Sequence, residues 1–169
     1  MLFKRKKETP VVEEVKPIEP TPEEAELYFK VYGTSEQNSD GSSRQEVLAK
    51  VATDIVNKVD PALLYHRLSD KAIQDIGKTV AEIDSLRYYM SIVKCDLGYD
   101  VVCKHGKIGY MPDYVVQEYE DLCQKYKKQK VNVKLSGGRC KYYDEKKGKI
   151  CFTHEDYEAK ATVYFKEPL

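Results

Sequence analysis

Residues 101–112 read Val-Val-Cys-Lys-His-Gly-Lys-Ile-Gly-Tyr-Met-Pro, and this stretch decides the predicted fold. Two short apolar segments flank a polar turn at 104–106, a pattern typical of a tight β-hairpin. The hairpin is predicted to have strands at about 99–104 and 107–111. Pro112 ends the second strand because proline cannot donate to a strand ladder.

The sequence on either side predicts further short elements. Asp113 opens a helix whose apolar residues recur every three or four positions, the spacing of one helix face. A polar loop follows the first strand, and Asp60-Pro61 ends the helix after that loop. The predicted elements outside the hairpin are strands at 27–34, 86–95, 130–135, 139–143, 149–152 and 157–165, and helices at 43–59 and 113–126, with helical character over 61–84.

These elements predict an α+β fold with two or three helices and about six or seven short antiparallel strands. Short, tightly connected strands favour a small SH3-like or OB-like barrel, because closure removes exposed sheet edges. Residues 1–26 are rich in Pro and Glu and are expected to form a disordered tail. Residues 27–169 are expected to form one domain, with 61–84 as a helical insertion.

The 28 basic and 28 acidic residues balance overall but are unevenly distributed along the chain. Residues 8–26 contain seven Glu and one Lys, whereas residues 125–149 contain ten Lys or Arg and two acidic residues. A basic segment of this kind is typical of a surface that faces a polyanion. A solvated lysine-rich hairpin explains the same composition equally well.

Several function classes find no support in the sequence. Five cysteines occur at irregular spacing without a CxxC pair, so no structural zinc site, other metal or cofactor is predicted. No catalytic constellation and no phosphate-binding glycine loop occurs, so the protein is expected not to be an enzyme. No apolar run reaches the roughly 20 residues of a membrane helix, and no signal peptide is recognised. A reduced, cytoplasmic protein without a membrane partner is therefore expected.

The hairpin and two further motifs resemble the HIRAN domain, a small β-barrel module linked to nucleic-acid processing. Phe29-Lys30-Val31-Tyr32-Gly33 resembles the opening strand of that family, and Arg44-Gln45-Glu46-Val47-Leu48 resembles its first helix. The Gly109-Tyr110-Met111-Pro112 element resembles the end of its core hairpin. The resemblance covers roughly residues 29–50 and 86–128, and it implies binding of single-stranded DNA ends.

The family's Tyr-Asp pair before the hairpin matches Tyr99-Asp100, which the resemblance assigns to a base and a terminal sugar hydroxyl. The family's Arg-aromatic pair is absent, because Thr34, Ser35 and Glu36 occupy its place. Packing of Tyr99 against the hairpin and turn geometry at Asp100 are the alternative interpretations.

The residues themselves suggest further contacts with nucleic acid. Lys104 and Lys107 flank the hairpin turn, where they can contact phosphates or simply be solvated. The basic 125–149 segment interleaves cations with tyrosines, a composition suited to backbone and base contacts. The candidates from this segment are Lys128, Lys130, Lys134, Arg139 and Tyr142. Lysines are also favoured at a helix C-terminus by its dipole.

Two functions are therefore predicted. The first is a non-enzymatic module that binds single-stranded DNA or another nucleic acid. The second is a protein-interaction module that uses residues 1–26 or 61–84 as its contact surface, and zero net charge favours it.

Overall fold

The computed structural model describes residues 21–169, so the part of the predicted tail up to residue 20 lies outside the described residues. The first strand, β1 (Glu24–Lys30), begins before the predicted start at Leu27. It pairs antiparallel with the last strand from Glu24 to Lys30. Residues 24–26 therefore belong to the sheet and not to the tail.

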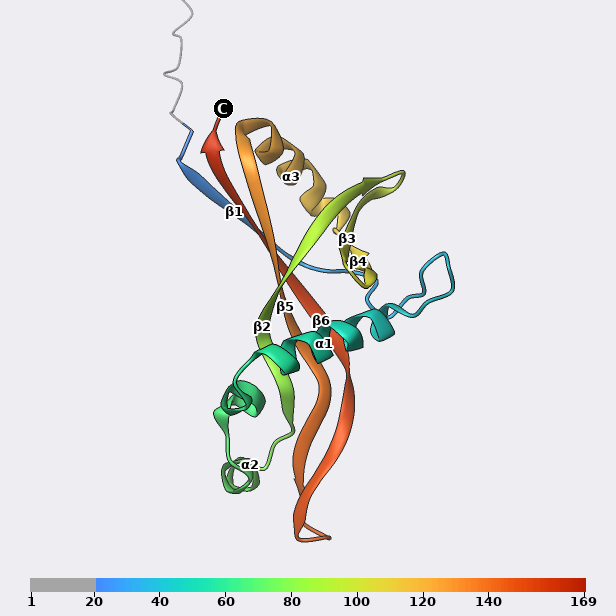
Figure 1. The fold of residues 1–169 in the computed structure, drawn as a ribbon, viewed down its shortest axis with the longest axis vertical. Coiled ribbons are helices and arrows are strands. Elements are labelled where there is room, and N and C mark those ends of the chain that lie inside the picture. The colour runs from blue at the N-terminus through green and yellow to red at the C-terminus, as the bar shows by residue number, and fades with distance from the viewer. Residues whose placement is uncertain (1–20) are drawn as a thin grey trace, which may run out of the picture.

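The described residues form the α+β fold that the sequence predicts (Figure 1). The predicted hairpin at 99–111 and the predicted helices at 43–59 and 113–126 are confirmed. The remaining elements are α1 (Arg44–Lys58), the 3-10 helix η1 (Pro61–Arg67), α2 (Asp70–Ile76), β2 (Val80–Cys95), β3 (Gly98–Cys103), β4 (Gly106–Tyr110), α3 (Asp113–Lys125), β5 (Tyr126–Asp144) and β6 (Lys149–Pro168).

The sheet is not closed into the predicted barrel. Its six strands are ordered β1-β6-β5-β2-β3-β4, with β1 and β4 at the two ends. The first part of β2 pairs with β5 and its last five residues pair with β3, so the β3–β4 hairpin branches away from the long strands. The chain after β1 meets β4 at one isolated bridge, where Tyr32 and Tyr110 exchange two hydrogen bonds of 3.0 Å.

Residues 61–84 are helical only in part, because β2 already begins at Val80. Ser69 caps α2 by accepting a hydrogen bond from the Ala72 N–H, and Gly77 ends it with φ +61°. Val80 and Ile83 are then buried in the sheet, so burial of apolar side chains outweighs the helical spacing there.

The turn predicted at 136–138 is a β-bulge inside one long strand. Gly137 and Gly138 have φ of +103° and +77°, which favours glycine but does not require the chain to reverse. A Cβ on Gly138 would lie 2.3 Å from the Tyr157 ring, so glycine lets β5 pass closely over β6. The strands predicted at 130–135 and 139–143 are therefore both parts of β5, and those predicted at 149–152 and 157–165 are both parts of β6.

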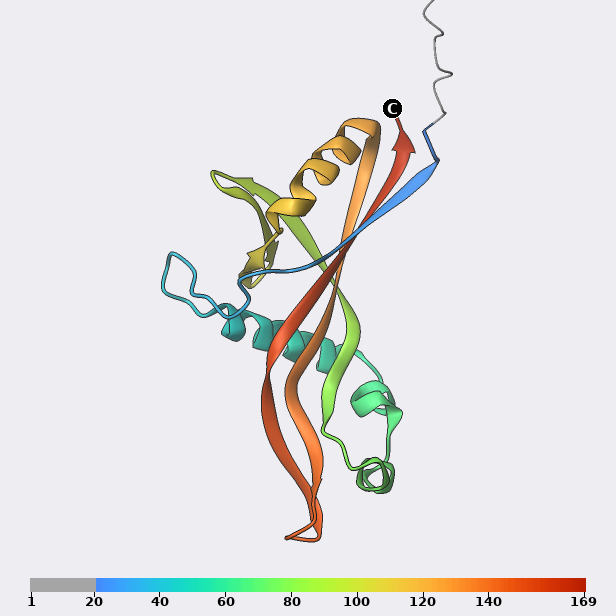
Figure 2. The same cartoon turned by 180° about the vertical axis from the view of Figure 1, so that it is seen from behind.

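One face of the sheet carries the hydrophobic core. Leu27, Phe29, Val133 and Val163 point to this inner face, where they pack with buried residues of α1 and α3. Seen from behind, the long strands lie in front of α1, so helix and sheet form two layers (Figure 2). The alternate residues of the same strands point to the opposite, outer face.

The Arg44-Gln45 pair at the start of α1 fixes the loop that precedes it. Arg44 is only 6% exposed, and its guanidinium donates hydrogen bonds to the Gly33 carbonyl at 2.8 Å and to Glu36 and Asn38 at 2.9 Å. The Gln45 amide bridges to β6 by accepting from the Tyr157 N–H at 2.8 Å and donating to the Tyr157 carbonyl at 3.0 Å. This motif therefore has a structural role.

Candidate nucleic-acid interface

The outer face of β1, β6, β5 and β2 gathers cations and tyrosines from segments far apart in the sequence. Figure 2 views the molecule from the side on which the long strands lie in front of α1. We define the outer face by the residues that alternate with the core positions on these strands. They are Tyr28 and Lys30 of β1, Lys160, Thr162 and Tyr164 of β6, Lys130, Asn132 and Lys134 of β5, and Arg87 and Tyr89 of β2.

Four cations form a row across this face, one from each strand. Lys30 is opposite Lys160, Lys160 is opposite Lys134, and Lys134 is opposite Arg87. Neighbouring strands lie about 4.8 Å apart, so the row spans about 14 Å. Like charges directly opposite each other destabilise a sheet. Glu158 pairs with Lys30 at 2.9 Å, whereas no acidic side chain of residues 21–169 forms an ion pair with the other three. We call this set the cation row.

Beside the cation row lies a row of aromatic and polar side chains. Tyr28 is opposite Thr162, Thr162 is opposite Asn132, and Asn132 is opposite Tyr89. The two tyrosines at the ends of this row are 65% and 64% exposed, whereas Asn132 and Thr162 are buried. The rings therefore stand above a polar floor.

A cleft of about 570 Å³ lies on the outer face over β2, β5 and the end of β6. Arg87, Tyr89, Asn132 and Tyr164 line it, together with lysines of β5 and β6. The Lys130 ammonium lies 4.3 Å from the centre of the Tyr89 ring, a cation–π distance. We call this cleft the outer cleft.

Acidic side chains also lie on the outer face, where Glu167 lines the outer cleft and Glu26, opposite Tyr164, accepts a hydrogen bond from the Tyr28 hydroxyl. Glu24 pairs with Lys166 at 2.7 Å, and Glu167 pairs with Lys128. Lys130, which lines the outer cleft, forms no ion pair with an acidic residue of the described chain. Positive charge is therefore concentrated on Lys130 and the cation row.

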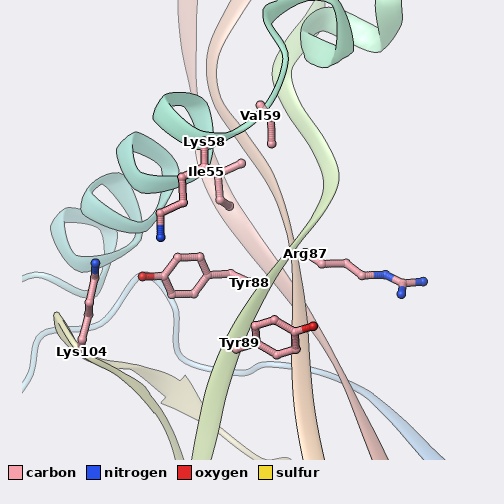
Figure 3. A pocket seen from close by; sticks show the side chains of 7 residues that line it. All are labelled: Ile55, Lys58, Val59, Arg87, Tyr88, Tyr89 and Lys104. Atoms are coloured by element: carbon pink, nitrogen blue, oxygen red, sulfur yellow. The ribbon is translucent and has the colours of Figure 1, made fainter.

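A second cleft, of about 460 Å³, continues around the edge of β2 (Figure 3). It shares Arg87 and Tyr89 with the outer cleft and adds Tyr88, with Lys58 of α1 and Lys104 of the hairpin turn. Figure 3 shows Arg87 and Tyr88 leaving β2 on opposite sides, with Tyr88 turned toward Lys104. The two clefts together form a basic, tyrosine-lined path around this strand.

Asp54 of α1 holds the hairpin turn at the end of that path. Its carboxylate accepts a hydrogen bond from the Tyr88 hydroxyl at 2.7 Å and lies 2.8 Å from both Lys104 Nζ and His105 Nε2. The hydrogen bond from Lys104 is the largest cause that lowers the pKa of Asp54, followed by those from Tyr88 and His105. The charge of Lys104 is therefore balanced by the Asp54 carboxylate.

Tyr99, Asp100 and Lys107 line a different cleft, of about 720 Å³, between the hairpin and the loop before α1. Tyr99 donates a hydrogen bond to Glu120 at 2.9 Å and stacks edge-on against Tyr119. Lys107 pairs with Asp100 at 2.6 Å. Glu36, Asp96 and Asp113 also line this cleft, whose acidic residues outnumber its cations. This hairpin cleft is poorly suited to phosphate.

The predicted site residues are thus divided among separate places. Lys128, Lys130 and Lys134 belong to the outer cleft or the cation row. Arg139 and Tyr142 lie beyond the bulge of β5, where the Arg139 guanidinium is 4.1 Å from the centre of the Phe152 ring. Neither of these two residues lines the outer cleft.

Six cations and tyrosines of the outer face did not belong to the predicted site: Tyr28, Lys30, Arg87, Tyr89, Lys160 and Tyr164. Each occupies an alternate position of a strand whose other positions are apolar. That alternation was the available signal for an outward-facing cation or tyrosine. The pairing that brings them together involves strands far apart in the sequence.

The described residues offer neither a metal site nor a membrane-spanning helix. Residues 21–169 hold no group of three His, Cys, Asp or Glu side chains arranged to bind a metal ion. None of the helices in this part of the chain combines the length and apolar character needed to cross a membrane.

Comparison with known proteins gave no relative. No protein-family model, no curated protein and no solved structure matches this chain.

Proposed function

We propose that the protein is a non-enzymatic module that binds single-stranded nucleic acid across its outer face. The cation row is the observation that carries this proposal. Only Lys30 of these four cations is balanced by an acidic side chain, so repulsion among the other three destabilises the sheet, and a polyanion lying across them relieves it. Neutralised phosphates also release counterions, which favours binding.

The neighbouring tyrosines favour single strands over duplexes. Tyr28 and Tyr89 are exposed beside the cation row, and Tyr164 lines the outer cleft. A base stacked on an aromatic ring contributes about 1–3 kcal/mol and needs no particular sequence. The bases of a duplex are stacked inside it and cannot reach these rings. The resemblance to the HIRAN domain stays a prediction, and it implies the same class of ligand.

The test is a fluorescence-anisotropy titration with a labelled single-stranded 15-mer and a 15-base-pair duplex. We expect the single strand to bind more tightly than the duplex. About four phosphate contacts give a salt slope near −3, so affinity should fall about 50-fold between 50 and 200 mM salt. Absence of binding to single-stranded DNA and RNA at 50 mM salt would overturn the proposal.

A pair of charge reversals locates the binding surface. Lys134→Glu, in the cation row, should weaken binding by about tenfold or more because it removes a phosphate contact and adds repulsion. Lys71→Glu changes the net charge equally on exposed α2 and should have an effect of about twofold or less. Equal losses in the two variants would mean that the cation row has no special role.

Protein interaction is the second candidate function. Leu63 of η1 and Ile76 of α2 are exposed apolar side chains in the segment predicted to contact a partner. The Pro22 carbonyl accepts a hydrogen bond from Tyr126 at 2.9 Å, so a truncation that tests the tail should retain residue 22. A protein lacking residues 1–20 should capture fewer partners in a pull-down if the tail contacts them, and an identical set counts against this role.

A further inference from the structure

Asn132 is a polar side chain buried at the floor of the outer face. It is 8% exposed and lines the outer cleft. Its Oδ1 atom is buried and has no hydrogen-bond partner among residues 21–169. Almost all buried polar atoms in proteins have such a partner, because an unpaired one keeps the cost of losing water. This amide therefore needs an explanation.

The fold does not require an amide at this position. Asn is disfavoured in strands, whereas a β-branched side chain of similar size packs well on a pleated surface. The neighbours across the sheet are Tyr89 and Thr162, and neither forms a hydrogen bond with the amide. An apolar residue would remove the unpaired atom without removing a hydrogen bond to Oδ1.

The surroundings of Asn132 have the features of a base-binding site. Tyr89 and Tyr164 line the same cleft, and Arg87 and Lys130 bring positive charge to it. A primary amide presents one donor and one acceptor side by side. Adenine presents the complementary pair, an exocyclic amino group beside a ring nitrogen.

We propose that Asn132 recognises adenine, by accepting from its 6-amino group and donating to a ring nitrogen, while the base stacks on a tyrosine of the outer cleft. This inference rests on the proposed function and adds base selectivity to it. In the structure Oδ1 is shielded from solvent, so this contact requires a rotation about the last side-chain torsion, which is broad for Asn, to bring Oδ1 to the base.

The experiment compares two labelled 12-mers, one of adenine and one of unsubstituted purine, each made as DNA and as RNA. Purine stacks much as adenine does but has no exocyclic amino group, so it cannot supply the donor of the bidentate contact. The unmodified protein should bind the adenine strand about tenfold more tightly, the selectivity typical of one bidentate contact. Asn132→Val should bind both strands equally and keep the salt slope of the unmodified protein.

A stability measurement separates this role from damage to the fold. Removing an unpaired buried amide should raise the unfolding temperature of Asn132→Val, even as it abolishes selectivity. Asn132→Thr, which also suits a strand, should lose selectivity in the same way. Gln74→Ala removes an exposed amide from α2 as a control and should leave selectivity unchanged.

The possible results are distinct. An unmodified protein that binds both strands equally would overturn the role of Asn132 and leave the proposed function standing. Selectivity that persists in both Asn132 variants, or an equal loss of affinity for the two strands, would also overturn it. If the unmodified protein bound neither strand, the proposed function itself would be overturned. The DNA and RNA arms show which sugar the site accepts.

Discussion

Asp54 shows how one carboxylate connects three parts of the structure. It lies on α1 and contacts Tyr88 of β2 and Lys104 and His105 of the hairpin turn. Hydrogen bonds from these groups, that from Lys104 above all, lower its pKa. The ionised carboxylate therefore helps to hold the hairpin against the body of the protein.

The stability that Asp54 provides should depend on pH. A carboxylate whose folded-state pKa is depressed stabilises the fold above its unfolded pKa of about 3.9, and the effect is lost as the pH falls through the lower folded value. Asp54→Asn should lower the unfolding temperature at pH 7, and the difference should shrink below about pH 4. Thermal unfolding between pH 7 and pH 2.5 measures this.

The control for that series is Asp75→Asn, on the exposed end of α2. It removes the same charge from a position without an ion pair in the described residues. We expect little change at any pH. If Asp54→Asn lowered the unfolding temperature by the same amount from pH 7 to pH 2.5, the loss of the ionised Asp54 carboxylate would not be the cause of that decrease.

At the scale of elements, the bulge in β5 depends on Gly138. Its φ is +77°, and a Cβ there would lie 2.3 Å from the Tyr157 ring. Gly138→Ala should lower the free energy of unfolding by about 2–4 kcal/mol, from backbone strain together with overpacking. Denaturant titration measures the difference.

Gly148 is the matched control in the β5–β6 turn. Its φ is +62°, but the nearest atom to a Cβ would be 3.9 Å away. Gly148→Ala should therefore lower the free energy of unfolding by about 1–2 kcal/mol, the cost of the backbone strain alone. Equal losses for the two substitutions would show that close packing against Tyr157 is not what Gly138 provides.

The cation row should lower the stability of the free protein. Lys160 lies opposite Lys30, whose charge Glu158 partly balances, and opposite Lys134, which repels it. Lys160→Thr should raise the free energy of unfolding by about 0.5–1 kcal/mol in low salt while weakening nucleic-acid binding. Denaturant titration at two salt concentrations measures the effect.

Salt provides the check on that prediction. Screening weakens repulsion between exposed charges, so the gain from Lys160→Thr should shrink as the salt concentration rises. Lys71→Thr on α2 removes the same charge outside the row and should not raise stability. A lower stability of Lys160→Thr in low salt would contradict repulsion within the row.

At the scale of the whole molecule, the local patterns were the predictable part. The hairpin at 99–111 follows from its turn chemistry, and α3 follows from its apolar spacing, because both signals lie within a few neighbouring residues. The turn predicted at Gly137-Gly138 was wrong, because glycines with positive φ occur in β-bulges as well as in turns. The prediction of a closed barrel was also wrong, because closure depends on whether the edges of strands distant in the sequence pair with each other.

The candidate site was predictable only in part for the same reason. Lys130 and Lys134 stood out within a basic segment, but their neighbours Arg87 and Lys160 come from strands distant in the sequence. A single sequence does not give the register between such strands. A shift of one residue would turn every one of these side chains to the other face.

The charge distribution makes the proposed polyanion site compatible with a net charge of zero. Four acidic residues line the hairpin cleft, whereas the outer face carries the cation row and Lys130, and Glu167, which lines the outer cleft, is paired with Lys128. Exposed charges more than about 8 Å apart are largely screened at physiological ionic strength. The proposed binding would therefore depend on the local field of the outer face and not on the net charge.

Photo-crosslinking of a 4-thiothymidine-containing single strand, followed by trypsin digestion and mass spectrometry, tests the central claim most directly. The account predicts adducts in the peptides of residues 88–94 and 161–166, which carry Tyr89 and Tyr164. Adducts confined to the peptide of residues 95–104, which carries Tyr99 and Asp100, would place the strand in the hairpin cleft and contradict the account.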